Sequence, residues 1–270
     1  MDSKLRQLQL SELEILDEFV RVCEKHGLQY YLVGGTLLGA VRHQGFIPWD
    51  DDIDVAMPRE DYDRFAEISA RELAPQYFYQ SPETDPYYFL TYAKVRKNGT
   101  EVYEERFKAA RFHKGVFIDI FPLDFCPKPG LLCHLLFNVL AVMNYRGQVD
   151  SGEAYVPYEE ISGKIGYAVL RMFSPKGIVG IRKKLLKLSK YMSKGSHMAC
   201  YAGAYGYRKE VFPIDWLRAG KELSFEGRMF LAPIAHERLL SRSYGEAYMS
   251  LPPEEERRQH TVIEKIDFER

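Results

Sequence analysis

The sequence predicts an α/β or α+β fold, a mixed sheet flanked by helices, with an added and mostly helical region. Helical and strand periodicities alternate up to about residue 125, residues 130–210 follow a helical pattern, and the remainder returns to short mixed segments. The 270 residues, 46% of them hydrophobic, suffice for one large domain or two small ones. We expect a core over residues 1–127, a helical and basic region over 128–210, and a C-terminal segment over 211–270 that packs back on the core.

Composition and charge exclude several classes of protein. A formal net charge of -1 gives no reason to expect a nucleic-acid partner. The N-terminus is too polar for a signal peptide, and no apolar run reaches the roughly 18 residues of a membrane span. No pair of the cysteines has the CxxC spacing of a zinc ribbon, and no disulfide framework is indicated. We therefore expect a cytoplasmic protein with four reduced thiols, Cys23, Cys126, Cys133 and Cys200.

The first elements alternate between helix and strand. Residues 10–26 have helical periodicity, with Ser11 as N-cap and Glu14 completing a capping box. A short buried strand is predicted over 30–33, a tight turn at Gly34-Gly35, and a helix over 36–43. A second strand over 52–57 precedes a helix over 58–73, which begins at Pro58.

The following segment, up to about residue 125, is predicted to be mainly strand. Residues 76–80 and 90–96 have strand patterns, and Asn98-Gly99 is typical of a hairpin turn whose return strand covers 101–105. Residues 115–121 form another apolar strand that contains one acidic residue, Asp119.

The helical region is strongly basic. Residues 161–209 contain eleven Lys and Arg and no Asp or Glu. Residues 178–194 form a basic amphipathic helix, which is typical of helices that lie on anionic membrane surfaces. An ordinary helix, packed on the domain with a solvated basic face, explains the same pattern. His260, near the C-terminus, is interpreted as a surface histidine.

Four aspartates lie within five residues in WDDDIDV, residues 49–55. In a strand, Asp50, Asp52 and Asp54 would share one face and Asp51 would point to the other. Clustered carboxylates are unfavourable unless a cation neutralises them, and oxygen ligands suit Mg²⁺ or Mn²⁺. The alternative is a solvated acidic turn.

Three segments could converge on one site: the Gly34-Gly35 turn, the Asp52/Asp54 strand and Asp119. Glycines at a strand-to-helix turn let backbone N–H groups approach a phosphate, and the Thr36 hydroxyl lies beside them. A third carboxylate could complete a metal site or accept a proton from an attacking hydroxyl. This combination suits phosphoryl-type transfer, which depends on charge neutralisation and on positioning.

The stretch YYLVGGTLLGAVRHQGFIPWDDDIDVAMPREDYDRF, residues 30–65, resembles the signature of the LicD family. HKGVFIDIFPLD, SFEGRMFLAP and YGEAYMSLPPEEERRQH extend the resemblance over nearly the whole chain. The family has a nucleotidyltransferase-type fold, is similar to the fukutin-type ribitol-phosphate transferases, and moves phosphocholine from CDP-choline onto cell-surface glycans. The cysteine and histidine cluster that binds zinc in some of those relatives is not evident here.

The resemblance implies roles for particular residues. Gly34 and Gly35 match the turn that faces the nucleotide phosphates, and Thr36 follows it. Asp52 and Asp54 match the paired metal ligands, and Asp119 matches the third carboxylate, our candidate for the base. Asp50 fits the family's acidic motif, either as an alternative ligand or as a residue that supports the ligands without contacting the ion.

Two cations and a group of aromatic residues are further candidates for ligand contacts. Arg42 lies in the motif loop, and Lys94, which alternates with Arg96 on a strand, could also contact the diphosphate; structural roles explain both equally well. An aromatic cage for a quaternary ammonium group could come from Trp49, Tyr77, Tyr79, Tyr87, Tyr88 or Tyr92.

The resemblance implies transfer of phosphocholine from CDP-choline to a sugar hydroxyl of a teichoic-acid or lipopolysaccharide-type precursor, with release of CMP. The acceptor is expected to be lipid-linked, which would give the basic helix a role at the inner membrane face. The alternatives are a nucleotidyltransferase acting on a small molecule, a transferase of another CDP-alcohol phosphate, a glycosyltransferase with a DxD motif, and a non-catalytic membrane-surface adaptor.

Overall fold

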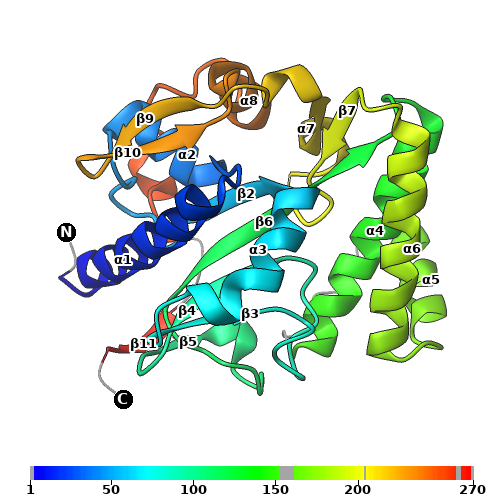
Figure 1. Cartoon of the computed structure of the whole chain (residues 1–270), viewed down its shortest axis with the longest axis horizontal. Helices are drawn as coiled ribbons and strands as arrows, with labels where there is room; N and C mark the ends of the chain where they lie inside the picture. Colours follow the sequence, from blue (N-terminus) through cyan, green and yellow to red (C-terminus); the bar gives the residue numbers. More distant parts are fainter. Residues whose placement is uncertain (1–2, 153–160, 204, 260–262, 269–270) are drawn as a thin grey trace.

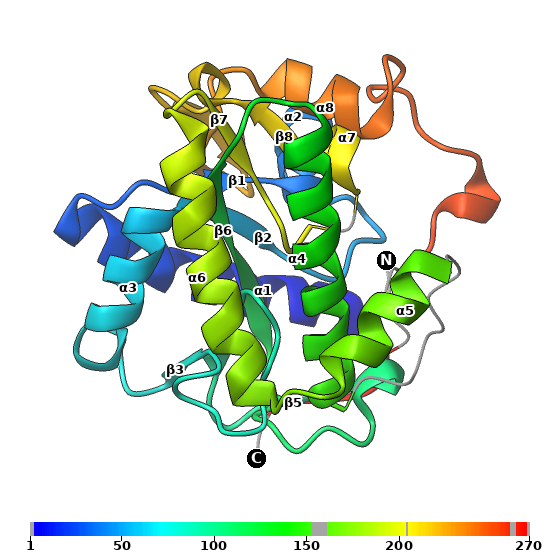
Figure 2. The same cartoon turned by 90° about the vertical axis from the view of Figure 1, so that its right-hand side faces the viewer.

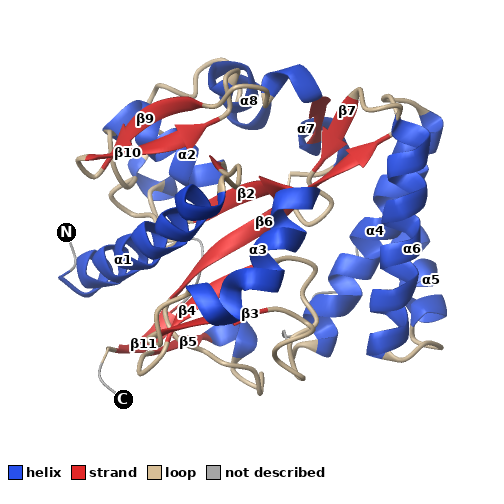
Figure 3. Cartoon of the chain, in the orientation of Figure 1, coloured by secondary structure: helices blue, strands red, loops and turns tan. Residues whose placement is uncertain are grey.

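A computed structural model describes residues 3–152, 161–203, 205–259 and 263–268 of the chain. His260 lies outside the described residues. A curled, mixed sheet forms the centre of the molecule, with helices on both sides (Figures 1 and 3), which confirms the predicted mixture of helix and strand. In the described part of the chain, none of the helices combines the length and the apolar character needed to cross a membrane.

The central sheet has seven strands in the described part of the chain. β6 lies in the middle, between β2, which is parallel to it, and β4, which is antiparallel. β1 pairs with β2, β3 with β4, and β7 joins β8 to the far end of β6. The bounds are β1 (Tyr31–Leu32), β2 (Asp54–Pro58), β3 (Tyr77–Gln80), β4 (Ala93–Lys97), β6 (Phe117–Cys126), β7 (His197–Ala199) and β8 (Val211–Pro213).

The period-two pattern of β2 and β6 separates an apolar face of the sheet from a polar one. Val55 and Met57, like Ile118 and Ile120, are completely buried in the main core. Helices α1 (Ser3–His26) and α3 (Arg59–Glu72) contribute to the same core. Because alternate side chains point to opposite faces, the intervening residues of β2 and β6 face the other side, where the candidate site lies.

Two predicted boundaries near the N-terminus need correction. α1 begins at Ser3, so Ser11 lies inside the helix and does not cap it. The buried Leu5 and Leu8 extend the apolar face of the helix toward the N-terminus, which explains the earlier start. Helix α2 (Gly34–His43) also begins earlier than predicted, and Gly34 and Gly35 form its first turn.

The predicted hairpin at Asn98-Gly99 does not form a pair of adjacent strands. β5 (Glu101–Glu104) follows the turn but pairs with β11 (Ile263–Asp267). Both edges of β4 are already occupied, by β3 and by β6, so β4 has no edge left for its successor. The turn residues were correctly identified, but the strand's partner comes from the C-terminus.

The predicted helical region is confirmed as three helices that form an outer layer, seen face-on in Figure 2: α4 (Leu131–Asp150), α5 (Ile161–Leu170) and α6 (Pro175–Ser193). The segment after β7 contains α7 (Tyr207–Glu210), the hairpin of β9 (Lys221–Phe225) and β10 (Arg228–Ala232), and α8 (His236–Tyr244). The hairpin and α8 pack against β1 and α2, and thereby close one side of the site.

Candidate active site

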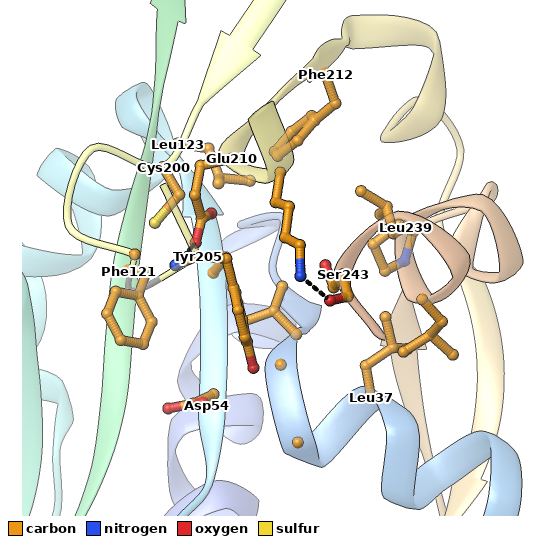
Figure 4. Close-up of a pocket in the computed structure, with 18 of the residues that line it drawn as sticks. Leu37, Asp54, Phe121, Leu123, Cys200, Tyr205, Glu210, Phe212, Leu239 and Ser243 are labelled. Atoms are coloured by element: carbon orange, nitrogen blue, oxygen red, sulfur yellow. Dashed lines mark hydrogen bonds between the residues drawn. The ribbon is translucent and has the colours of Figure 1, made fainter. Parts of the chain in front are cut away.

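A cavity of about 370 Å³ lies between the polar side of β2 and β6 and the segment that follows β7. Its inner end is formed by the start of α2 and by Asp50, Asp52 and Asp54. Its outer wall comes from α8 and from Cys200, Gly203, Tyr205, Lys209, Glu210 and Phe212, so segments far apart in the sequence enclose it (Figure 4). Gly34, Gly35, Asp52 and Asp54, all predicted from the sequence, therefore line one cavity.

The third predicted carboxylate lies beside this group on the neighbouring strand. The parallel register of β2 and β6 places Asp54 directly opposite Asp119. β4 places Lys94 opposite Asp119 on the other side, and the Lys94 ammonium donates a hydrogen bond to Asp119 Oδ1. Lys94 is fully buried, and neither Lys94 nor Asp119 is among the residues that line the cavity. This geometry makes Lys94 a counter-ion of Asp119, and the predicted contact with a diphosphate has no support here.

The acidic segment before β2 differs from the predicted strand. Strand pairing begins only at Asp54, so residues 50–53 do not follow a period of two. One ligand oxygen from each of Asp50, Asp51 and Asp52 lies within 4.8 Å of the others. The prediction that Asp51 points away from the cluster is therefore wrong, and Asp51 is 4% exposed.

The two glycines at the start of α2 are required by the carboxylates they face. A Cβ on Gly34, whose φ is +57°, would lie 2.8 Å from Asp54 Oδ2. A Cβ on Gly35 would lie 2.6 Å from Asp50 Oδ2. Any larger residue would displace a carboxylate, and glycine also lets a ligand approach the N–H groups of the helix N-terminus.

The two polar residues predicted beside this turn have structural contacts. The Asp54 backbone N–H donates to Thr36 Oγ1 over 2.8 Å, which fixes the start of β2 against α2. Arg42 lies at the other end of α2, where its Nη1 donates to the carbonyls of Tyr248 and Ser250, at 2.9 and 3.0 Å. Arg42 thus anchors the C-terminal segment and does not line the cavity.

Burial and mutual repulsion raise the pKa values of Asp50, Asp52 and Asp54. Burial is the largest cause for Asp52, followed by the charges of Asp51 and Asp119, and its pKa rises to about 7. The pKa of Asp54 and that of Asp50 rise well above the usual range for the same reasons. Burial also raises the pKa of Asp119, against the opposing effect of Lys94. The cluster therefore favours a bound cation or protonation.

A further acid, missed in the sequence, faces this cluster from α1. Glu12 is 1% exposed, and in the described structure its Oε2 has no hydrogen-bond partner. Burial, followed by the charges of Asp52 and Asp51, raises its pKa well above the usual value. A single glutamate on an amphipathic helix is typical of the solvated face. Its position among the apolar Leu8, Leu13 and Leu16 was the only available signal.

The aromatic residues of the cavity are not those suggested by the sequence. Tyr79, Tyr88 and Tyr92 are packed into the cores and do not line it. The rings that line it are Phe121, Tyr205, Phe212 and Tyr244. The hydroxyls of Tyr205 and Tyr244 are 2.6 Å apart. Three of the four come from segments after residue 200. No local sequence pattern indicated that these segments pack against the central sheet.

The inner end of the cavity combines features needed for reactions at phosphate. Asp50, Asp51 and Asp52 form an oxygen-only donor set at this end, which fits a hard divalent cation such as Mg²⁺ or Mn²⁺. The start of α2 has no side-chain cap, so its N–H groups are available to a phosphate. The outer part is mainly apolar and aromatic, which suits an organic group attached to that phosphate.

Comparison with known proteins supports the resemblance seen in the sequence. Residues 27–148 match the LicD/FKTN/FKRP nucleotidyltransferase domain. The chain is 31% identical over 264 residues to the lipopolysaccharide cholinephosphotransferase LicD of Haemophilus influenzae, covering 96% of this chain and 97% of that protein. Human ribitol 5-phosphate transferase FKRP is 43% identical over 53 residues, which are 20% of this chain and 11% of FKRP. An uncharacterized protein of Rickettsia prowazekii, RP689, is 40% identical over 68 residues, 25% of this chain and 24% of RP689.

Proposed function

The chain belongs to the LicD family, and on this basis we propose that it transfers phosphocholine from CDP-choline to a glycan hydroxyl. The acceptor is a sugar of a lipopolysaccharide- or teichoic-acid-type precursor, and CMP is released. The observation that carries this proposal is the single cavity that joins carboxylates, a helix N-terminus and aromatic walls. The nearly full-length similarity to a cholinephosphotransferase makes phosphocholine the preferred group.

The diphosphate of the donor is expected at the inner end of the cavity. Asp52, Asp54 and Asp119 would hold Mg²⁺ or Mn²⁺, with Asp50 as an additional ligand. When bound, the ion neutralises phosphate charge and polarises the phosphoryl oxygens. Gly34 and Gly35 leave room for a phosphate oxygen to reach the N–H groups of α2.

The reaction proposed is a displacement at the phosphorus that carries choline. A sugar hydroxyl oxygen forms the new bond to this phosphorus, and the bond from phosphorus to the oxygen bridging it to CMP breaks. The hydroxyl proton passes to Asp119, whose carboxylate lies on the neighbouring strand, directly opposite Asp54. The ion pair with Lys94 holds the Asp119 carboxylate in position.

We propose that the enzyme acts at the inner face of the membrane on a lipid-linked acceptor. Part of the apolar face of α6, including Ile178 and Leu185, packs into the protein. Its outer side still exposes Lys184 and Lys187, beside the 49% exposed Leu188 and the 86% exposed Tyr191. Helix α4 lies beside α6 in the same layer (Figure 2). Its exposed Leu131, Leu132 and Leu135 add apolar surface there. Cations next to exposed apolar side chains suit an anionic bilayer surface.

The membrane proposal is tested with vesicles. Replacing Lys184 and Lys187 by Gln should weaken sedimentation with anionic vesicles and leave CMP release from CDP-choline and a soluble acceptor unchanged. The same replacement at the exposed Lys25 and Lys108 provides the charge-matched control. Equal binding of the two double variants would refute a docking role for α6.

The proposed reaction is tested by identifying the product that leaves. Purified protein with CDP-choline, a lipopolysaccharide- or teichoic-acid-type acceptor and Mg²⁺ should release CMP and form a phosphocholine-modified glycan. A nucleotidyltransferase of the same fold would instead release pyrophosphate from a nucleoside triphosphate. CDP-ribitol and CDP-ethanolamine in parallel reactions identify the alcohol phosphate, and phosphocholine transfer slower than both would overturn the choice of donor.

A further inference from the structure

The outer end of the cavity contains a buried acid with no role in holding the phosphates. Glu210, the last residue of α7, is 8% exposed and lines the cavity opposite the aspartates. Its Oε1 accepts a hydrogen bond from the Tyr205 N–H over 3.1 Å. A Cβ on Gly203 would lie 2.0 Å from this oxygen, so glycine there leaves the space that the carboxylate occupies. The loop and α7 together fix the carboxylate at the wall of the cavity (Figure 4).

No cation forms an ion pair with Glu210 among the residues that the structure describes. The adjacent Lys209 lines the same cavity, but its Nζ donates to the backbone carbonyl of Ser243 on α8 (Figure 4). The neighbouring Cys200 is a buried thiol whose pKa is raised by burial and by the charge of Glu210. A buried carboxylate whose negative charge is balanced by no ion pair with the described residues favours a cationic ligand.

The surroundings of Glu210 are aromatic and apolar. Phe121, Tyr205 and Phe212 line the cavity with it, and Figure 4 shows Tyr205 between Glu210 and Asp54. Leu123 and Leu239 complete the walls. Aromatic faces attract cations, and apolar walls suit a group that neither donates nor accepts hydrogen bonds.

We propose that Glu210 and the rings of Phe121, Tyr205 and Phe212 form a subsite for the quaternary ammonium group of choline. This inference rests on the proposed function, and it assigns the substrate's alcohol to a particular wall of the cavity. A trimethylammonium group carries a positive charge but has no N–H to donate, so a carboxylate and aromatic faces satisfy it completely. A primary ammonium would need three acceptors, and a sugar alcohol such as ribitol would need several polar partners.

With this subsite, the two parts of phosphocholine follow one another along the cavity, the phosphate at the inner end and the choline at the outer end. The phosphate lies at the aspartates and at the start of α2, and the choline extends from it toward Glu210, past Tyr205. Specificity for choline over a neutral alcohol would then come from Glu210, and specificity over ethanolamine from the apolar and aromatic walls. The aspartates need no part in choosing the alcohol.

The direct test measures binding of choline and of 3,3-dimethylbutanol, its neutral carbon isostere, to the purified full-length protein by titration calorimetry. Glu210→Gln should weaken choline binding by about tenfold or more and leave the isostere unaffected. Tyr205→Leu should weaken choline binding, while Tyr205→Phe retains the ring and should preserve it. Glu222→Gln, an exposed acid on β9, is the matched control. Thermal unfolding of each variant verifies that it is folded.

Turnover separates this inference from the proposed function. CMP release from CDP-choline with an unchanged choline preference in Glu210→Gln would overturn the subsite and leave the proposed reaction intact. Choline binding that depends on Glu210 and Tyr205, without any CMP release by the wild type, would support the subsite and overturn the reaction. Equal affinity of the wild type for choline and its neutral isostere would overturn the subsite whatever the turnover.

Discussion

Replacement of Asp52 by Asn should stabilise the metal-free protein at alkaline pH. The pKa of Asp52 rises from 3.8 to about 7 in the folded state. Because folding raises this pKa, the folded protein binds the proton more tightly than the unfolded chain does. The free energy of unfolding is therefore highest below pH 4, where Asp52 is protonated in both states, and it falls as pH rises through 7. At about 1.4 kcal/mol for each tenfold change in proton affinity, ionised Asp52 destabilises the fold by up to about 4 kcal/mol at pH 8. Asn has the same shape and carries no charge.

The assay is thermal unfolding in EDTA and in Mg²⁺, at pH 4 and at pH 8. In EDTA at pH 8, Asp52→Asn should raise the Tm by on the order of 10 °C, and the difference should vanish near pH 4. Mg²⁺ should stabilise the wild type at pH 8 through linkage and stabilise the variant much less. Asp215→Asn, which removes a carboxylate that is 75% exposed, is the control and should leave the Tm nearly unchanged.

Two results would refute this reasoning. A metal-free Asp52→Asn protein that is no more stable than the wild type at pH 8 would show that the carboxylates do not repel one another as their burial implies. Equal stabilisation of both proteins by Mg²⁺ would show that the cation binds elsewhere.

Three further predictions concern the glycines, the buried ion pair and the outer wall. Gly35→Ala should lower Mg²⁺-dependent CMP release by roughly a hundredfold because its Cβ displaces Asp50. The control is Gly180→Ala, whose Cβ meets nothing within 4 Å, and equal rates of CMP release by the two variants would contradict the role of Gly35. Lys94→Met should destabilise the metal-free protein by about 3–5 kcal/mol in urea unfolding because it leaves Asp119 buried without its cation, and adding Asp119→Leu should restore much of this loss. Choline should bind more tightly as pH rises through about 7, where Glu210 ionises beside Lys209, Cys200 and Tyr205. The affinity of the Glu210→Gln variant for choline should not change with pH over that range.

The inner end of the site could be predicted because its residues lie close together in sequence. Gly34, Gly35, Asp52 and Asp54 fall within 21 residues, and apolar neighbours identified the strand that carries Asp54. Asp119 could be identified from the sequence because a single acidic residue in an otherwise apolar strand is conspicuous. The sequence could not reveal that Lys94 pairs with it, since this depends on β4 lying antiparallel beside β6.

The outer wall depends on long-range packing and was not predicted. Tyr205 and Glu210 belong to a segment with little periodicity, and β7 brings that segment back to the end of β6. The partner of β5 was missed for a related reason, because β4 was already paired on both edges. Local patterns specify which residues form a strand, whereas the free edges of the assembled sheet decide which strand pairs with it.

The most direct test of the central proposal is a comparison of CMP release from CDP-choline by the wild type and by Asp54→Asn, with glycan acceptor and Mg²⁺ present. The proposal predicts rapid release by the wild type, dependent on the acceptor and abolished by EDTA, and a loss of at least a hundredfold in the variant. Undiminished release of CMP by folded Asp54→Asn would contradict the assignment of this cavity as the active site.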